Sequence, residues 1–358
     1  MGNGRYGPPP VPFIVPRSQP PAVITNARVL QEDFVPRDVV HRHEEVDRLA
    51  SALEPLLAGE PPETPLVFGP TGVGKTCVAR YTLERLREQL LDLRTTYVNC
   101  WQHHSRFRVL LELLDEVGRT VDVHRQSTPH DELLERLRGH DEHPLVVVLD
   151  EVDQLDDSRL LYELLEVPHL HPVLVSNREE DLFVDLDERV ASRLRGGPRI
   201  RFARYGLDEL VAILEARVER GFEPESVARE HLERIADAAA GDARVAIRIL
   251  RSAARLAESR GVTEIEADLL AEAVPEGRKA VKQRAVDSLT PHQRTLYEVV
   301  EDAGEVEPGD LYDRYEVRVD EPKSKRTVRK YMAKLDQYNL VEAAGEKRGR
   351  TYRQVPPE

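Results

Sequence analysis

The chain has 358 residues and a formal net charge of −14 at pH 7, so it is long enough for two or three domains and acidic overall. No apolar run approaches the roughly 18 to 20 residues that a membrane-spanning helix needs, and the amino terminus lacks the charged-then-apolar order of a secretory signal. Two cysteines are too few for a disulfide framework. These features predict a cytoplasmic protein with no membrane partner.

The acidity is unevenly distributed. Residues 322–350 carry nine Lys or Arg against three Asp or Glu, a local charge of +6, and residues 351–358 sum to zero, which leaves −20 for residues 1–321. Only 8 of the 51 basic residues are lysine. The acidic, lysine-poor composition of residues 1–321 would result either from adaptation to a salt-rich cytoplasm or from GC-rich coding. The basic segment near the carboxyl terminus predicts a nucleic-acid partner despite the net charge.

The first predicted elements lead into a glycine-rich loop. Residues 1–24 are rich in proline and predict a flexible leader, and the apolar spacing from Glu44 onward predicts an amphipathic helix that ends at a Gly/Pro cluster. The short apolar run "PLVFG" follows, and "KTCVARYTLERLREQL" has helical spacing again. The segment therefore predicts strand, loop and helix.

Four more apolar runs of strand length follow the loop, separated by helical patterns. With "PLVFG", the five predicted strands lie near residues 65–69, 95–101, 143–153, 171–177 and 198–203. Strands that alternate with helices predict an α/β fold with a parallel sheet covered on both faces, and such sheets bind ligands at the carboxyl ends of their strands. The glycine-rich loop lies at one of these ends.

The loop "GPTGVGKT" fits the phosphate-binding pattern G-x-x-x-x-G-K-T between a strand and a helix. Backbone N–H groups and the positive helix end would hold the phosphates of ATP or ADP, Lys75 would reach the β- and γ-oxygens, and Thr76 would ligate Mg²⁺. The predicted cradle consists of Gly69, Pro70, Thr71, Gly72, Val73, Gly74, Lys75 and Thr76.

Hydrolysis also needs acidic groups near the phosphates, and the third strand ends in them. In "VVVLDEVD", Asp150 is placed to hold the Mg²⁺ shell and Glu151 to deprotonate or orient the attacking water. Asn177 follows the next strand and offers an amide to the γ-phosphate and to that water. The sequence therefore predicts an ATPase site built from strand ends.

The second half of the chain is predicted to form two further domains. Helical patterns near 207–220, 225–239, 242–260 and 264–275 have no strands between them and predict a small helical domain over 206–277. Helical patterns near 290–302, 308–315 and 324–338 and then two strand-like runs joined by a basic turn predict a winged helix-turn-helix over 286–355.

The last of these helices is strongly basic and amphipathic. An apolar stripe of Val328, Tyr331, Met332 and Leu335 leaves the cations for another side, as a DNA recognition helix requires. The predicted DNA-binding residues are Lys325, Arg326, Arg329, Lys330 and Lys334 on the helix and Lys347, Arg348 and Arg350 at the turn of the wing.

Together these motifs resemble a known family. The glycine loop, the Asp-Glu pair and the strand-end Asn are similar to the AAA+ ATPase core, here over residues 25–205. The stretches "DFVPRDVVHRHEEVDRLASAL", "LDEVDQL" and "GDARVAIRILRSAA" are similar to the archaeal Orc/Cdc-type origin-recognition initiators, and the resemblance covers roughly residues 25–355.

The resemblance implies further site residues. Val40, His41 and Arg42 would line the adenine side, Tyr205 and Arg217 would contact the nucleotide, and Arg244 would reach the γ-phosphate from the helical domain. An arginine finger would act across a subunit contact, with Arg193 preferred over Arg189. An insertion near residues 119–130 offers Arg119 and Arg125 to DNA.

The function implied is that of an ATP-dependent, nucleoid-associated replication initiator. It would bind double-stranded origin DNA, help recruit the replicative helicase, associate with itself or with paralogues on DNA, and hydrolyse ATP slowly as a switch. The alternatives are a paralogue acting as a DNA-binding transcriptional regulator, a clamp-loader-like ATPase and a mobile-element ATPase. A clamp loader would not need a basic winged helix.

Overall fold

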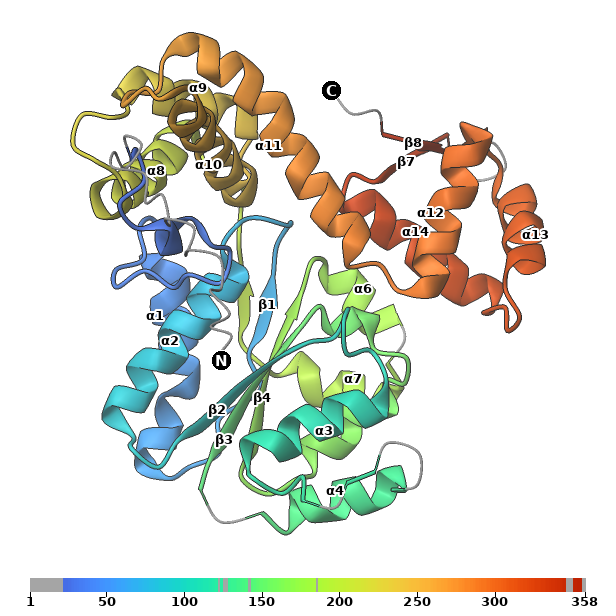
Figure 1. Ribbon diagram of the computed structural model, residues 1–358. Coiled ribbons are helices and arrows are strands. Elements are labelled where there is room, and N and C mark those ends of the chain that lie inside the picture. Colours follow the sequence, from blue (N-terminus) through green and yellow to red (C-terminus); the bar gives the residue numbers. More distant parts are fainter. Residues whose placement is uncertain are drawn as a thin grey trace, which may run out of the picture.

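The computed structural model describes residues 22–121, 123–124, 128–140, 143–184, 186–345 and 350–355. The chain folds into a domain built on a central sheet, called the ATPase domain below after its predicted site, a helical unit called the lid, and a C-terminal unit (Figure 1). Most of the predicted leader, together with Arg125, Lys347 and Arg348, lies outside the described residues. Among those residues, no helix combines the length and apolar character that crossing a bilayer would require.

The central sheet is parallel and contains all five predicted strands. Its spatial order is β2-β3-β4-β1-β5, with every neighbouring pair parallel. The strands are β1 (Leu66–Phe68), β2 (Arg94–Asn99), β3 (Leu145–Asp150), β4 (Leu170–Ser176) and β5 (Arg199–Arg201). The α/β prediction is therefore confirmed.

Both faces of the sheet are covered because its central strands are apolar on both sides. On β3, Val146 and Val148 pack in a cluster with residues of α1 and α2, whereas Leu145, Val147 and Leu149 pack with α3, α4 and α5. Figure 1 shows α1 and α2 on one side of the sheet and α3 and α7 on the other. Each fully buried aliphatic side chain of this kind contributes roughly 1.5 to 3 kcal/mol.

The helices of the ATPase domain follow the strands in chain order. They are η1 (Ala27–Leu30), α1 (His43–Leu53), η2 (Glu54–Ala58), α2 (Lys75–Gln89), α3 (Arg106–Glu116), α4 (His130–Arg138), η3 (Val152–Gln154), α5 (Arg159–Leu165), α6 (Glu179–Val184) and α7 (Glu188–Arg195).

The lid has the four predicted helices, α8 (Leu207–Gly221), α9 (Arg229–Ala239), α10 (Ala243–Arg260) and α11 (Ala267–Asp287). The last of them does not end near residue 275 as expected but continues through Pro275. A proline inside a helix costs about 3 kcal/mol, so packing must offset it. A Cβ on Gly277 would lie 2.8 Å from the Cα of Ile249, which shows how closely α11 packs on α10.

The C-terminal unit has the three predicted helices followed by two antiparallel strands, and in addition a short strand between the first two helices that was not predicted. Its helices are α12 (Pro291–Ala303), α13 (Pro308–Arg318) and α14 (Lys325–Gln337), and its antiparallel strands β6 (Glu305–Val306), β7 (Val341–Ala344) and β8 (Thr351–Gln354) are arranged β6-β8-β7. Ser324 caps α14 by accepting a hydrogen bond from the N–H of Thr327. The turn between β7 and β8, residues 346–349, lies outside the described residues, and the winged-helix assignment stays a prediction.

Candidate nucleotide site and its contact with helix α14

The phosphate loop joins β1 to α2 in a conformation that requires glycine. Gly74 precedes Lys75, the first residue of α2, with φ of 91°, and a Cβ there would lie 2.6 Å from the Tyr205 hydroxyl. The loop also contacts the lid, because the N–H of Ala243 donates to the carbonyl of Gly72 over 3.0 Å. The loop is thus enclosed by Tyr205 and by the first turn of α10.

Lys75 is buried, and its ammonium group points into the loop. Its Nζ donates to the carbonyls of Gly69 (2.6 Å) and Pro70 (2.8 Å) and to Oδ1 of Asn177 (2.9 Å). Burial lowers the pKa of Lys75 to about 8, partly offset by Asp150. A cation held among carbonyls at this position suits phosphate oxygens, and its contact with Asn177 joins two residues that are 102 positions apart in sequence.

Thr76 and Asp150, the two residues predicted to hold Mg²⁺, meet directly. The Thr76 hydroxyl donates to Oδ2 of Asp150 over 2.5 Å, and the Tyr97 hydroxyl donates to the same oxygen over 2.9 Å. Hydroxyl and carboxylate oxygens are the ligands that Mg²⁺ prefers, so the donor set fits this ion. Sequence reasoning missed Tyr97, because no motif spacing connects a residue inside β2 with the end of β3.

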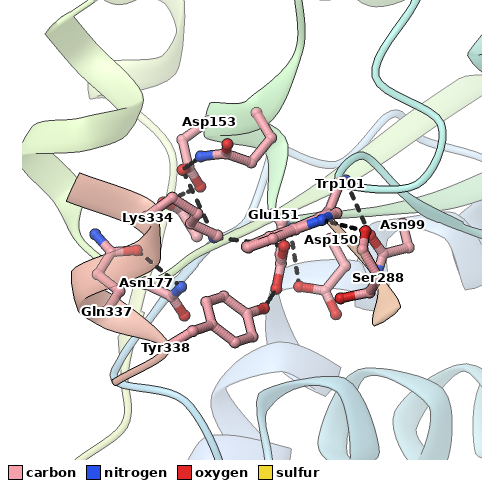
Figure 2. A network of polar contacts seen from close by, with 12 residues as sticks. Asn99, Trp101, Asp150, Glu151, Asp153, Asn177, Ser288, Lys334, Gln337 and Tyr338 are labelled. Carbon is pink, nitrogen blue, oxygen red and sulfur yellow. Dashed lines mark hydrogen bonds and ion pairs between the residues drawn. The ribbon is translucent and has the colours of Figure 1, made fainter. Parts of the chain in front are cut away.

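The backbone turns sharply at Glu151, directly after the end of β3. Its φ of 54° is in the left-handed region, which is unusual for a residue other than glycine and is often found at functional sites. Burial raises the pKa of Glu151 to about 7, an effect that Lys334 opposes. The Tyr338 hydroxyl donates to Oε1 of Glu151, and the Nζ of Lys334 lies 3.4 Å from Oε2 (Figure 2).

Asp153, Ser176, Gln337 and Asp181 extend this cluster. Asp153 lies 3.9 Å from the Nζ of Lys334 and accepts a hydrogen bond from the Ser176 hydroxyl over 2.9 Å. Gln337 accepts from the Asn177 amide over 3.2 Å and donates to Asp181 over 2.7 Å. Figure 2 shows Asp153 and Asn177 near Glu151, with Lys334, Gln337 and Tyr338 entering from the C-terminal unit.

Lys334 was predicted to lie with the other cations on the DNA-binding side of the basic helix, and this placement is wrong. Its side chain is 1% exposed and lies against Glu151 and Asp153 of the ATPase domain. The periodicity of α14 separates an apolar stripe from a charged one, but it does not reveal that a second domain covers part of the charged stripe.

The remaining predicted DNA-binding residues have different surroundings. Arg326 donates to the carbonyl of Val184 over 3.2 Å and Lys330 to that of Leu155 over 3.4 Å, so both cations reach the ATPase domain rather than only solvent. Those that are exposed are Lys325, Arg326, Arg329 and Arg350, and Lys330 is half-buried. Arg119, from the predicted insertion, is also exposed.

Of the residues predicted to contact the nucleotide, Arg42 and Tyr205 lie together, whereas Arg217 contacts other residues. Arg42 is buried, with its guanidinium carbon 4.0 Å from the ring centroid of Tyr205, and it donates to the carbonyl of Ala203 over 2.7 Å. Val40 is half-buried two residues before it. Arg217 instead donates to the carbonyl of Val29 over 2.8 Å and stacks on Phe34. Its role as a nucleotide contact stays a prediction.

Arg244 belongs to the lid and Arg193 to helix α7 of the ATPase domain. Arg244 is in the first turn of α10 beside the phosphate loop, and its buried Nε has no hydrogen-bond partner among the described residues. Arg193 pairs with Glu166 and donates to the carbonyl of Leu165, just before the amino end of β4. Arg189 is exposed on the same helix. Arg193 thus lies toward the amino ends of the strands, whereas the glycine-rich loop follows the carboxyl end of β1, and its role as an arginine finger stays a prediction.

Comparisons with known proteins agree with this geometry. A family model described as an AAA ATPase domain matches residues 38–176, and one described as a Cdc6 AAA+ ATPase-type lid domain matches residues 211–274. ORC1-type DNA replication protein 9 of Halobacterium salinarum is 48% identical over 333 residues, which are 93% of this chain and 94% of the relative. ORC1-type DNA replication protein 1 of the same organism is 52% identical over 307 residues, 86% of this chain and 100% of the relative.

A solved structure extends the similarity to three dimensions. The Aeropyrum pernix ORC1 protein in complex with DNA superposes with a TM-score of 0.71 at 28% identity, over 92% of each chain. The Halobacterium relatives also accord with the acidic, lysine-poor composition expected for a salt-rich cytoplasm. With its AAA ATPase domain, its Cdc6-type lid and relatives of this identity along nearly its whole length, the chain belongs to the ORC1-type DNA replication proteins.

Proposed function

We propose that this chain is an ATP-dependent replication initiator that binds double-stranded origin DNA and hydrolyses ATP slowly, as a switch. The observation that carries the proposal is the meeting of Lys75, Thr76 and Asp150 at the carboxyl ends of the strands, with Glu151 and Asn177 beside them. Replicative helicase recruitment and association with further copies or paralogues on DNA belong to the same proposal. Arg193 is the residue proposed to act across such a subunit contact.

Each of these residues has a distinct role in the proposed reaction. Lys75 and Arg244 would bind the phosphates, and Arg42, Tyr205 and Val40 would enclose the base and sugar. Mg²⁺ held by Thr76 and Asp150 would neutralise charge on the β- and γ-phosphates. Glu151 would take the proton of the attacking water and Asn177 would orient it.

DNA binding is assigned to the exposed cations of the C-terminal unit. Lys325, Arg329 and Arg350 are exposed, and the rings that Lys325 and Arg350 contact, Tyr312 and Tyr352, belong to the C-terminal unit itself. Their charges are therefore available to phosphates. The DNA complex of the Aeropyrum pernix ORC1 protein, which shares the fold over 92% of each chain, supports DNA binding by this chain.

Replacing Lys325, Arg329 and Arg350 by alanine should weaken DNA binding without disturbing the ATPase domain. Each lost phosphate contact should flatten the dependence of log K on log salt by roughly 0.9, and each lost base contact should reduce discrimination between origin and random duplexes by about 1 to 3 kcal/mol. Binding isotherms on both duplexes at several salt concentrations measure the two effects.

A matched control replaces Arg229, Arg260 and Lys279, three exposed or half-exposed cations of the lid, and should bind DNA as the wild type does. If the C-terminal triple variant kept the wild-type affinity and salt slope, the assignment of DNA binding to this unit would be wrong.

A further inference from the structure

One stripe of residues on α14 and at its C-terminal end contacts the ATPase domain. Arg326, Lys330, Lys334 and Tyr338 recur every four residues and therefore form a single stripe along the helix. The first two donate to carbonyls of the ATPase domain, the third forms ion pairs with its acids, and the fourth donates to Glu151. The stripe consists mainly of the cations that the sequence assigns to DNA.

The centre of this contact is Lys334. An ammonium group that is 1% exposed is costly to bury unless it is paired, and here Glu151 and Asp153 lie 3.4 and 3.9 Å away. The rings of Trp101 and Tyr338 add cation–π contacts at 5.1 and 5.2 Å. Burial alone would lower the pKa of Lys334, but the two carboxylates raise it above its usual value, so the group stays charged.

The contact engages the groups that hydrolysis requires. Tyr338 donates to Oε1 of Glu151, the Nζ of Lys334 forms an ion pair with Oε2 at 3.4 Å without a hydrogen bond, and Gln337 accepts from the amide of Asn177. Glu151 and Asn177 are the two side chains proposed to deprotonate and orient the attacking water. While α14 is docked, the Tyr338 hydroxyl and the Lys334 ammonium group lie against Glu151, where the attacking water would have to approach it.

We propose that the acidic cluster of Glu151, Asp153 and Asp181 is a docking surface for α14, and that DNA phosphates compete with it for the same helix. Docking holds Glu151 and Asn177 away from water and covers one stripe of the basic helix. Binding of α14 to DNA removes Lys334 from the cluster and frees both groups for hydrolysis. The competition with DNA rests on the proposed DNA-binding role of the C-terminal unit, whereas the docking itself does not.

The chain contains a natural reporter of this docking. Its single tryptophan, Trp101, is 3% exposed and packs edge-on against Tyr338 with ring centroids 4.5 Å apart. Its indole N–H donates to the carbonyl of Ser288 over 2.7 Å, at the start of the C-terminal unit. Release of α14 would uncover the ring, so acrylamide quenching of its fluorescence measures release directly.

The test uses the full-length protein and compares Lys334→Met and Tyr338→Phe with Lys279→Met. Lys279 is an exposed lysine of α11 away from the acidic cluster and serves as the matched control. Lys334→Met should raise Trp101 quenching and single-turnover ATP hydrolysis several-fold without DNA. Tyr338→Phe, which removes one hydroxyl and keeps the ring, should change both in the same direction but less. Lys279→Met should behave as the wild type.

A random-sequence duplex is then titrated into the wild type, where it should increase both quenching and hydrolysis to the level of Lys334→Met. The proposal would be overturned if Lys334→Met and Tyr338→Phe both showed the Trp101 quenching and the ATP hydrolysis of the wild type, provided that circular dichroism and ATP binding show both variants folded. Release by Lys334→Met with no response to a duplex that binds would overturn the competition. If the duplex does not bind at all, the proposed function fails, while the two variants still report on docking.

Discussion

Replacing Lys75 by alanine should lower the affinity for ATP by a factor on the order of tens or more. Lys75 is 8% exposed and points its ammonium group at the loop carbonyls of Gly69 and Pro70. A bound phosphate would replace these carbonyls as its partners, and no side chain of the loop can substitute for the lost charge. Equilibrium binding of a fluorescent ATP analogue measures the effect.

The Lys279→Ala variant, which removes an exposed lysine of the lid, is the matched control and should bind ATP normally. Equal affinities of the Lys75 variant and the wild type would show that the glycine loop does not hold the phosphates.

Replacing Glu151 by glutamine should leave ATP binding intact and slow hydrolysis by about 100-fold or more, because glutamine keeps the size and hydrogen bonding of the side chain but cannot accept the proton. Single-turnover measurements with prebound ATP separate this chemical step from binding. Glu132→Gln, an exposed change on α4 outside the site, is the control.

The Glu151 variant has a second expected property, because Glu151 is also a partner of Lys334. Without its charge, the described residues leave the ammonium of Lys334 with Asp153, at 3.9 Å, as its ion-pair partner, so Trp101 should become more accessible to acrylamide. Hydrolysis at the wild-type rate in the Glu151 variant would exclude it as the base, whatever the state of Trp101.

The ATPase domain could be predicted from sequence because its signals are local. Each strand is a short apolar run, and strand ends meet at one edge of a parallel sheet, which brings Lys75 to Asn177 and Thr76 to Asp150. Tyr97 could not be predicted, since its hydroxyl reaches Asp150 from the interior of a neighbouring strand.

The predictions that were wrong concern contacts between segments far apart in sequence. Pro275 indicates a helix end, but close packing of Gly277 on Ile249 keeps α11 helical to Asp287. Lys334 has the helical position of a DNA-binding cation, yet its partners Glu151 and Asp153 lie more than 180 residues earlier in the chain. Local periodicity identifies a charged stripe but carries no information about which surface faces it.

Because α11 is one continuous helix, a tilt at one of its ends displaces the other end. With 21 residues it is about 30 Å long, so a tilt of about 10° at one end moves the other by roughly 5 Å. One end packs on α10, whose first N–H is bonded to Gly72 of the phosphate loop, and the other leads to Ser288, which accepts the indole N–H of Trp101. Such a displacement exceeds the 3.4 Å between Lys334 and Glu151. If nucleotide binding tilts the lid by about 10°, the resulting movement is therefore large enough to separate α14 from Glu151 and Asp153.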